Sequence, residues 1–198
     1  MIIIYHVLKK LVTIVIMKIS IKSGRNLSES DYLQIKEAFF REFKEGPNSP
    51  GDLSNHKFFL LKEGEKILAL GGLIPVKPVT FRGKIFNIVG IGGILANEKR
   101  KGYGKKIMTS IRRYLILHHE TGVGFCGERN IQFYEKCGFN IDRDSITRFI
   151  HHENGKRISN GMKTTTDFVV YLDSDDHFMK KVQENSSEDI ILPRPPNW

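Results

Sequence analysis

Residues 94–106 read Ile94-Leu95-Ala96-Asn97-Glu98-Lys99-Arg100-Lys101-Gly102-Tyr103-Gly104-Lys105-Lys106. The apolar end of an expected strand runs here into a basic turn spaced by two glycines, and an amphipathic helical pattern follows at once. Gly102 and Gly104 let the backbone approach a ligand without a Cβ atom in the way. The free N–H groups of the first helical turn and the helix dipole then favour an anion. This stretch predicts a phosphate-binding cradle.

Composition sets wider limits on the kind of protein. The 198 residues suit one domain of ordinary size, and the formal net charge of +9 indicates an acidic partner. A nucleotide-like cofactor, a nucleic acid and a membrane surface all meet that description. Cys126 and Cys137 are too few for a disulfide framework, which favours reduced thiols in a cytoplasmic protein.

Strand and helix patterns alternate along the chain. Apolar or alternating runs predict strands at 17–21, 58–61, 67–70, 84–96, 123–126, 139–150 and 164–172. Helices are expected from Ser28, which with Asp31 resembles a capping box, to before Gly46, then after the glycine turn, and over 131–136. Residues 77–83 and 151–163 are expected to be loops. This order predicts an α/β fold with a central mixed sheet of about six to seven strands and helices on both faces.

The first sixteen residues are apolar except for His6, Lys9 and Lys10. Their uncharged runs are too short to span a bilayer, and they lack the features of a secretory signal. Because an alternating strand pattern begins at Met17, we expect residues 1–16 to be an extension outside the functional core.

Two separated segments carry a resemblance to a known family. Lys99-Arg100-Lys101-Gly102-Tyr103-Gly104 resembles the Arg/Gln-x-x-Gly-x-Gly/Ala signature of the GNAT N-acetyltransferase superfamily, and residues 130–139, Asn-Ile-Gln-Phe-Tyr-Glu-Lys-Cys-Gly-Phe, resemble its second signature. A glycine pair after a strand is weak evidence alone, but the order and spacing of the two segments are specific. The resemblance implies an N-acetyltransferase domain over 17–175, followed by a tail, 176–198, that packs on it.

The resemblance also assigns roles to residues. It implies that acetyl-CoA, as co-substrate, binds the turn with its pyrophosphate and the end of the preceding strand with its pantetheine arm. It implies that Tyr134 is the acid that protonates the departing thiolate, a role that suits a phenol with an ordinary pKa near 10. The implied cofactor residues are Ile94, Leu95, Ala96, Lys99, Arg100, Lys101, Gly102, Tyr103, Gly104, Lys105, Asn130 and Phe133.

The chain departs from the family pattern in three places. Lys99 stands where Arg or Gln is usual, which keeps the charge but not the fork geometry of a guanidinium. Gly127 stands where asparagine is common, and Asn130 where alanine is. These departures affect the expected contacts to phosphate and pantetheine, and they leave the role of the tyrosine unchanged.

The acceptor amine needs a group that takes its proton. The strand before the turn holds no carboxylate, so the candidates are Glu42, Glu45, Glu98, Glu128 or a chain of waters. The chain ends in Trp198, as some aminoglycoside acetyltransferases do, and this resemblance implies that the terminal carboxylate contacts the substrate or acts as a base. The alternative is that the ring of Trp198 packs on the domain.

Other patterns receive plainer interpretations. The pairs His118-His119 and His151-His152 lack a carboxylate or cysteine at ligand spacing, so we expect no metal. The run Gly90, Gly92 and Gly93 either eases packing or allows a close approach by backbone or ligand.

Three classes of function follow from these observations. The first is an N-acetyltransferase that transfers acetyl from acetyl-CoA to a primary amine of a small molecule or peptide. The second is a non-catalytic acyl-CoA sensing module on the same fold. The third, a basic nucleic-acid-binding protein, is disfavoured because no aromatic residues interleave with the basic run. We expect acetyl-CoA and an amine as partners, neither nucleic acid nor a membrane, and a monomer or a homodimer.

Overall fold

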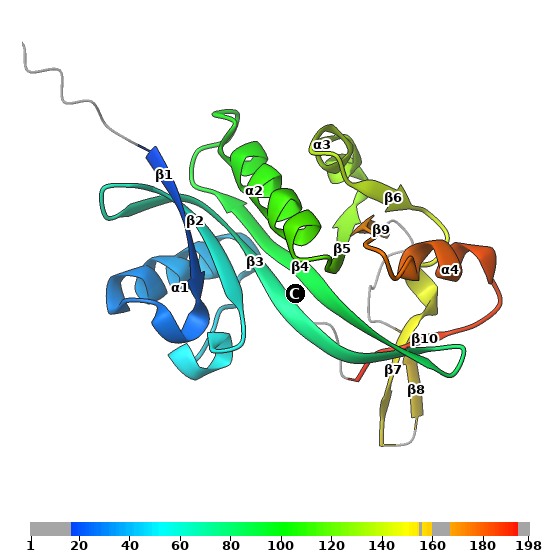
Figure 1. Ribbon diagram of the computed structural model, residues 1–198. Helices are drawn as coiled ribbons and strands as arrows, with labels where there is room; N and C mark the ends of the chain where they lie inside the picture. The colour runs from blue at the N-terminus through cyan, green and yellow to red at the C-terminus, as the bar shows by residue number, and fades with distance from the viewer. Residues whose placement is uncertain (1–16, 155, 160–166, 194–198) are drawn as a thin grey trace, which may run out of the picture.

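The computed structural model describes residues 17–154, 156–159 and 167–193, which fold around one strongly twisted sheet (Figure 1). Its ten strands are β1 (Met17–Ser23), β2 (Lys57–Glu63), β3 (Lys66–Phe81), β4 (Lys84–Ala96), β5 (Thr121–Gly127), β6 (Asn140–Asp142), β7 (Phe149–Glu153), β8 (Lys156–Ser159), β9 (Asp167–Leu172) and β10 (Ile190–Ile191). The helices are α1 (Glu29–Phe43), α2 (Tyr103–Leu117), α3 (Ile131–Lys136) and α4 (Phe178–Glu184). The mixed α/β class is confirmed, whereas six to seven strands was too few.

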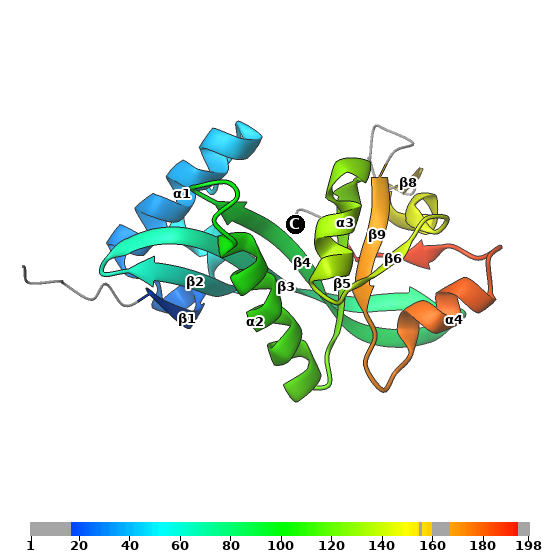
Figure 2. The ribbon, with the colours of Figure 1, turned by 90° about the horizontal axis from the view of Figure 1, so that it is seen from above.

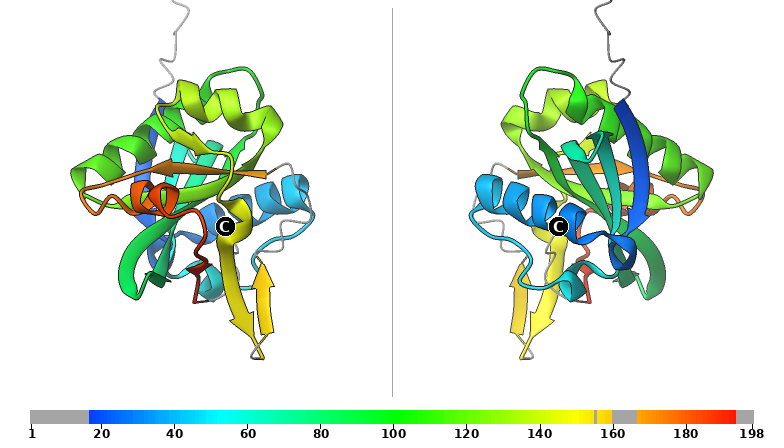
Figure 3. Two further views of the ribbon diagram at one scale, coloured as in Figure 1. Left: turned by 90° about the vertical axis from the view of Figure 1, so that its right-hand side faces the viewer. Right: turned by 90° about the vertical axis from the view of Figure 1, so that its left-hand side faces the viewer.

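The sheet separates α1 from α2, as the two views in Figure 3 show. Strand order is β6-β9-β5-β4-β3-β10-β7-β8, with β2 and then β1 beside the first half of β3. Ile35 and Ala38 of α1 pack on one face, and Ile107 and Ile111 of α2 pack on the other. Each helix therefore buries an apolar side against the sheet. Phe43, which continues the helical spacing of Ile35 and Phe39, is 50% exposed at the end of α1.

β4 and β5 are paired only along a short stretch. Their parallel ladder runs from Ile88↔Thr121 to Ile91↔Gly124, while β4 continues to Ala96 and β5 to Gly127. The two strands diverge beyond the ladder (Figure 2). Among the strands that the structure describes, none therefore pairs with this edge of the last residues of β4.

A bulge in β4 lies where the strands diverge. The register with β3 changes between Gly72↔Gly92 and Leu70↔Leu95, which places one extra residue in β4. Gly93 adopts φ 60°, and a Cβ there would lie 2.7 Å from the Phe39 ring of α1. Both facts favour glycine at position 93. Of the glycine run, Gly93 therefore allows the left-handed backbone of the bulge and the close packing of α1.

The expected loop at 77–83 is wrong for most of its length, because β3 continues to Phe81. Pro78 lies where the register between β3 and β4 changes, at a bulge that needs no N–H group. β2 pairs with β3 only as far as Leu73, and β10 pairs with it at Thr80. The proline therefore falls between the two ladders on that edge.

The single strand expected over 139–150 is also wrong. The chain turns after β6, because the Asp142 carboxylate accepts hydrogen bonds from the backbone N–H groups of Asp144 and Ser145, at 2.9 and 2.7 Å. β7 then pairs with β8 within the expected loop 151–163. The hairpin β7–β8 extends from the sheet on the side of α1 (Figure 3). Residues 155 and 160–166 lie outside the described residues.

The predicted tail contributes regular structure of its own. Phe178, Met179 and Val182 of α4 are buried against the sheet, and β10 lies between β3 and β7. The extension 1–16 and Trp198 lie outside the described residues. Within the described part of the chain, no helix combines the length and apolar character needed to cross a membrane.

The start of α1 confirms Ser28 as its N-cap. The Ser28 hydroxyl accepts a hydrogen bond from the Asp31 backbone N–H at 3.2 Å. The fully buried Asp31 carboxylate does not complete a capping box. It accepts instead from Lys22 of β1 at 2.6 Å and from Lys62 of β2 at 2.9 Å. These two ion pairs hold α1 against β1 and β2.

Replacing Asp31 with asparagine should lower the free energy of unfolding by about 2 kcal/mol at pH 7, since charge-assisted hydrogen bonds are lost. Burial alone would raise the pKa of Asp31, but the hydrogen bonds and charges of the two lysines outweigh it and lower the pKa below 3.8. A lowered pKa stabilises the fold above the unfolded value and loses that effect as pH falls through the folded value. Urea unfolding of both proteins from pH 7 to pH 3 measures this. A difference that is unchanged at pH 3 would contradict it.

Candidate functional site

A pocket of about 370 Å³ brings the two predicted motifs together. It lies between the end of β4, the start of α2 and α3, beside the divergence of β4 and β5 (Figure 2). Its lining consists of Ile94, Ala96, Glu98, Lys99, Arg100, Gly102, Tyr103, Gly104, Lys105, Asn130, Phe133 and Tyr134. Of the predicted residues, Leu95 and Lys101 do not line it. Leu95 packs toward α1 instead, and Lys101 is exposed.

The basic turn presents the first helical turn of α2 to this pocket. Arg100 and Gly102 adopt left-handed backbone, with φ 64° and 75°. Gly102 is the N-cap of α2, and no side chain caps the helix there. The Lys106 backbone N–H donates a hydrogen bond to the Gly102 carbonyl oxygen at 3.1 Å. The N–H groups before Lys106 thus remain free of a capping side chain. A helix start of this kind binds phosphate oxygens readily.

The cations of the turn are not equivalent. The Lys99 ammonium lies 3.4 Å from the carboxylate of Glu42 at the end of α1, and its side chain is 73% exposed. This pair is a surface contact of small energy. Lys105 lies at the start of α2 and lines the pocket, so positive charge surrounds the helix N-terminus on two sides.

The end of β4 forms another part of the pocket wall. Ile94 and Ala96 line the pocket from the part of β4 that has no pairing with β5. An extended ligand that carries amide groups can hydrogen-bond to such an edge as an added strand does. The bulge at Gly93 makes Ile94 and Ala96 face α2 while Leu95 faces α1. The sequence gives no sign of this bulge beyond its glycines.

Tyr134 enters the pocket from α3, the short helix that follows β5. Gly138, with φ 82°, ends this helix as expected, and the rings of Tyr134 and Phe133 contact edge to face at 5.1 Å. Burial, with smaller effects from Cys126 and Cys137, raises the pKa of Tyr134 above its usual value. The phenol therefore stays protonated at neutral pH.

The other candidate residues named from the sequence do not all lie at the pocket. Of the four glutamates considered as bases, Glu98 lines the pocket, while Glu42 pairs with Lys99. Cys126 and Cys137 are buried and are not joined in a disulfide. Across the described residues, no group of three His, Cys, Asp or Glu side chains is arranged to hold a metal ion.

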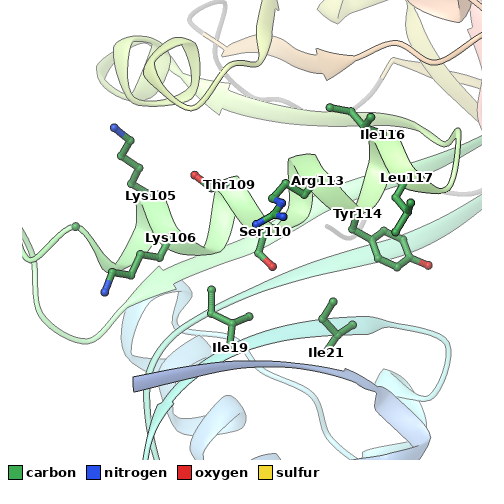
Figure 4. A pocket seen from close by; sticks show the side chains of 11 residues that line it. Ile19, Ile21, Lys105, Lys106, Thr109, Ser110, Arg113, Tyr114, Ile116 and Leu117 are labelled. Atoms are coloured by element: carbon green, nitrogen blue, oxygen red, sulfur yellow. The ribbon is translucent and has the colours of Figure 1, made fainter. Parts of the chain in front are cut away.

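The sequence did not predict a second hollow on the surface of the protein. It measures about 970 Å³ and lies between β1 and α2 (Figure 4). Its apolar side chains come from elements far apart in the chain, so no local pattern indicates it. It shares Gly102 and Lys105 with the first pocket.

Comparison with known proteins agrees with this geometry. A model of the acetyltransferase (GNAT) family matches residues 25–139, more than half of the chain. No curated protein matches in sequence. The solved structures that resemble the fold include an acetyltransferase from Bacillus subtilis in complex with CoA, with 19% identity, TM-score 0.50 and coverage of 80% of this chain and 99% of that one.

Two further solved structures also resemble the fold at low sequence identity. An N-acetyltransferase from Staphylococcus aureus Mu50 has 16% identity and TM-score 0.53, with 79% and 97% of the chains covered. An acyl-CoA N-acyltransferase from Pseudomonas aeruginosa has 11% identity and TM-score 0.52, with 78% and 98% covered. At such identities the likeness concerns the fold, and the family match extends over both motifs. The chain belongs to the GNAT acetyltransferase family.

Proposed function

We propose that the protein transfers the acetyl group of acetyl-CoA to a primary amine of a small molecule or peptide, with Tyr134 as the acid. The observation that carries the proposal is the pocket itself. A helix start with uncapped N–H groups, a strand edge that no described strand covers and a partly buried tyrosine face the same space. The helix start suits a diphosphate, the strand edge suits an amide-bearing arm, and the tyrosine suits a departing thiolate.

The residues that line the pocket fit both the pyrophosphate and the pantetheine arm of acetyl-CoA. The free N–H groups at the start of α2, with Arg100 and Lys105, would hold the pyrophosphate. The backbone of Ile94 and Ala96 would pair with the pantetheine arm. The pocket is open at Gly102, where a Cβ would meet no atom within 4 Å.

Transfer by direct attack then needs little covalent chemistry from the chain. A neutral amine attacks the thioester carbonyl, and an N–H of β4 near Leu95, beside the bulge, would stabilise the developing oxyanion. The rigid strand and helix hold the two reactants in line. Glu98, the candidate base that lines the pocket, would accept the proton of the ammonium directly or through water.

Tyr134 acts where the carbon–sulfur bond breaks. Its raised pKa keeps the phenol protonated, so it donates a hydrogen bond to the sulfur as negative charge develops there. A thiol is the stronger acid, so the phenol gives its proton to sulfur only as the acceptor nitrogen releases a proton that restores the phenol. The two buried thiols, Cys126 and Cys137, agree with a reducing compartment such as the cytoplasm.

Release of free thiol from acetyl-CoA tests the proposal. The purified protein would be incubated with acetyl-CoA and aminoglycosides, polyamines, amino acids or peptides with free N-termini. We expect at least one amine class to produce thiol and an acetylated amine that mass spectrometry detects. Calorimetric binding of acetyl-CoA without thiol release across the panel would favour the acyl-CoA sensing alternative. Salt-sensitive nucleic-acid binding without affinity for acetyl-CoA would favour the third class.

A further inference from the structure

The hollow between β1 and α2 has the chemistry of a binding groove for an extended chain. Ile19 and Ile21 of β1 form one side and point toward α2. Ser110, Tyr114 and Leu117 of α2 extend toward them, whereas Lys105 and Ile116 point away (Figure 4). Ile21 is 49% exposed and Leu117 is 74% exposed. Large apolar side chains exposed around one concave surface are typical of an interaction site.

β1 offers backbone groups beside this groove. It pairs with β2 through all seven of its residues, from Met17↔Glu63 to Ser23↔Lys57. No strand in the described part of the chain pairs with its other edge. An open edge of this kind can accept a further strand, because its N–H and C=O groups are arranged for a ladder.

The charges around the groove have one sign. Lys105, Lys106 and Arg113 line it from α2, and no carboxylate lines it. On the opposite face of β1, Lys18 is exposed. A strand added at this edge would therefore meet cations on both of its faces, which favours glutamate and aspartate on the incoming chain.

The same charges disfavour two other occupants, and the form of the groove disfavours a membrane or a nucleic acid. A second copy paired antiparallel about Ser20 would place Lys18 opposite Lys22, a like-charge pair. Residues 1–16 carry Lys9, Lys10 and no carboxylate, so they add positive charge to a positive groove. A membrane or nucleic acid would match the cations, but neither uses a strand edge and a concave apolar floor together.

We propose that this groove binds an acidic, extended segment of a partner protein, which adds as a strand to the open edge of β1 beneath α2. Backbone hydrogen bonds with β1 hold the segment, apolar side chains fill the floor at Ile21 and Leu117, and its carboxylates face Lys106 and Arg113. The proposal concerns a surface beside the acetyl-CoA pocket and holds whether or not the protein is a catalyst.

A fluorescein-labelled peptide of repeating Glu-Glu-Val-Val serves as the probe, because as a strand it carries both residue types on each face. The same peptide with lysine for glutamate is its control. Fluorescence anisotropy at low and high salt should show binding of the glutamate peptide alone, weakened by salt. Hydrogen exchange of the β1 amides should slow when it binds. The double variant Lys106→Glu/Arg113→Glu should lower the affinity about tenfold, from two surface charge pairs.

Lys84→Glu is the matched control, since Lys84 is an exposed lysine of the same sheet outside the groove. It should leave peptide affinity unchanged, and equal thermal midpoints show that the variants fold. Equal binding of both peptides, or none of either, overturns the proposal. So does binding that appears only after deletion of residues 1–16, a dimer in sedimentation that the double variant abolishes, or binding of anionic vesicles with the same sensitivity to that variant.

Discussion

Replacing Tyr134 with phenylalanine is expected to lower kcat about 10²- to 10⁴-fold, the usual contribution of a positioned acid. The substitution removes one oxygen from a side chain that lines the pocket and leaves the ring contact with Phe133 in place. The dissociation constant for acetyl-CoA should therefore stay close to that of the parent protein. Steady-state thiol release gives kcat, and calorimetry gives the binding constant.

Tyr171→Phe is the matched control for this prediction. Tyr171 of β9 is also partly buried, and burial also raises its pKa, but it lies outside the pocket. Its replacement should leave kcat unchanged. Equal turnover of Tyr134→Phe and the parent protein would remove the phenol from the mechanism, whereas a matching loss in both variants would indicate a structural effect.

The pH profile gives an independent reading of the same phenol. Because its pKa is raised, Tyr134 stays protonated across the neutral and mildly alkaline range, so it produces no loss of rate below about pH 10. The value of kcat/KM should instead rise with pH as the acceptor amine loses its proton. A descending limb between pH 7 and pH 9 that disappears in Tyr134→Phe would contradict the assignment.

Local patterns in the sequence predicted the parts of the fold that depend on neighbours in the chain. Ser28 caps α1, α2 begins after Gly102, and Gly138 ends α3, since each depends on a few adjacent residues. Most residues that line the pocket belong to the two motifs, and the resemblance to the family had implied that these motifs form one site. Leu95 was expected to line it, and the bulge at Gly93 turned it toward α1.

Features that depend on contacts distant in sequence could not be predicted. Pro78 looked like a loop residue, yet it occupies a bulge between two ladders on β3. β10 is only two residues long, and its strand conformation follows from pairing with β3 and β7. The groove beside β1 likewise requires Ile21 and Leu117, almost a hundred residues apart, to lie on one surface.

Replacing Gly102 with valine is expected to weaken acetyl-CoA binding about 100-fold, or about 2.7 kcal/mol. Gly102 adopts φ 75°, a conformation that a β-branched residue strongly disfavours. A Cβ there meets no atom within 4 Å, so the cost arises from the backbone and from a side chain placed on the ligand side of the turn. Relief of the strain would move the first N–H groups of α2, which the proposal assigns to the pyrophosphate.

Gly83→Val separates strain from ligand binding. Gly83 has φ 67°, and a Cβ there also meets nothing within 4 Å, but it lies in the turn between β3 and β4, at the opposite end of β4 from the pocket. Both variants should lose similar unfolding free energy, because the backbone strain is the same. Only Gly102→Val should lose affinity by calorimetry. Unchanged affinity in that variant would place the phosphates away from this turn, since strain at the N-cap of α2 cannot be accommodated without moving the N–H groups that were to bind them.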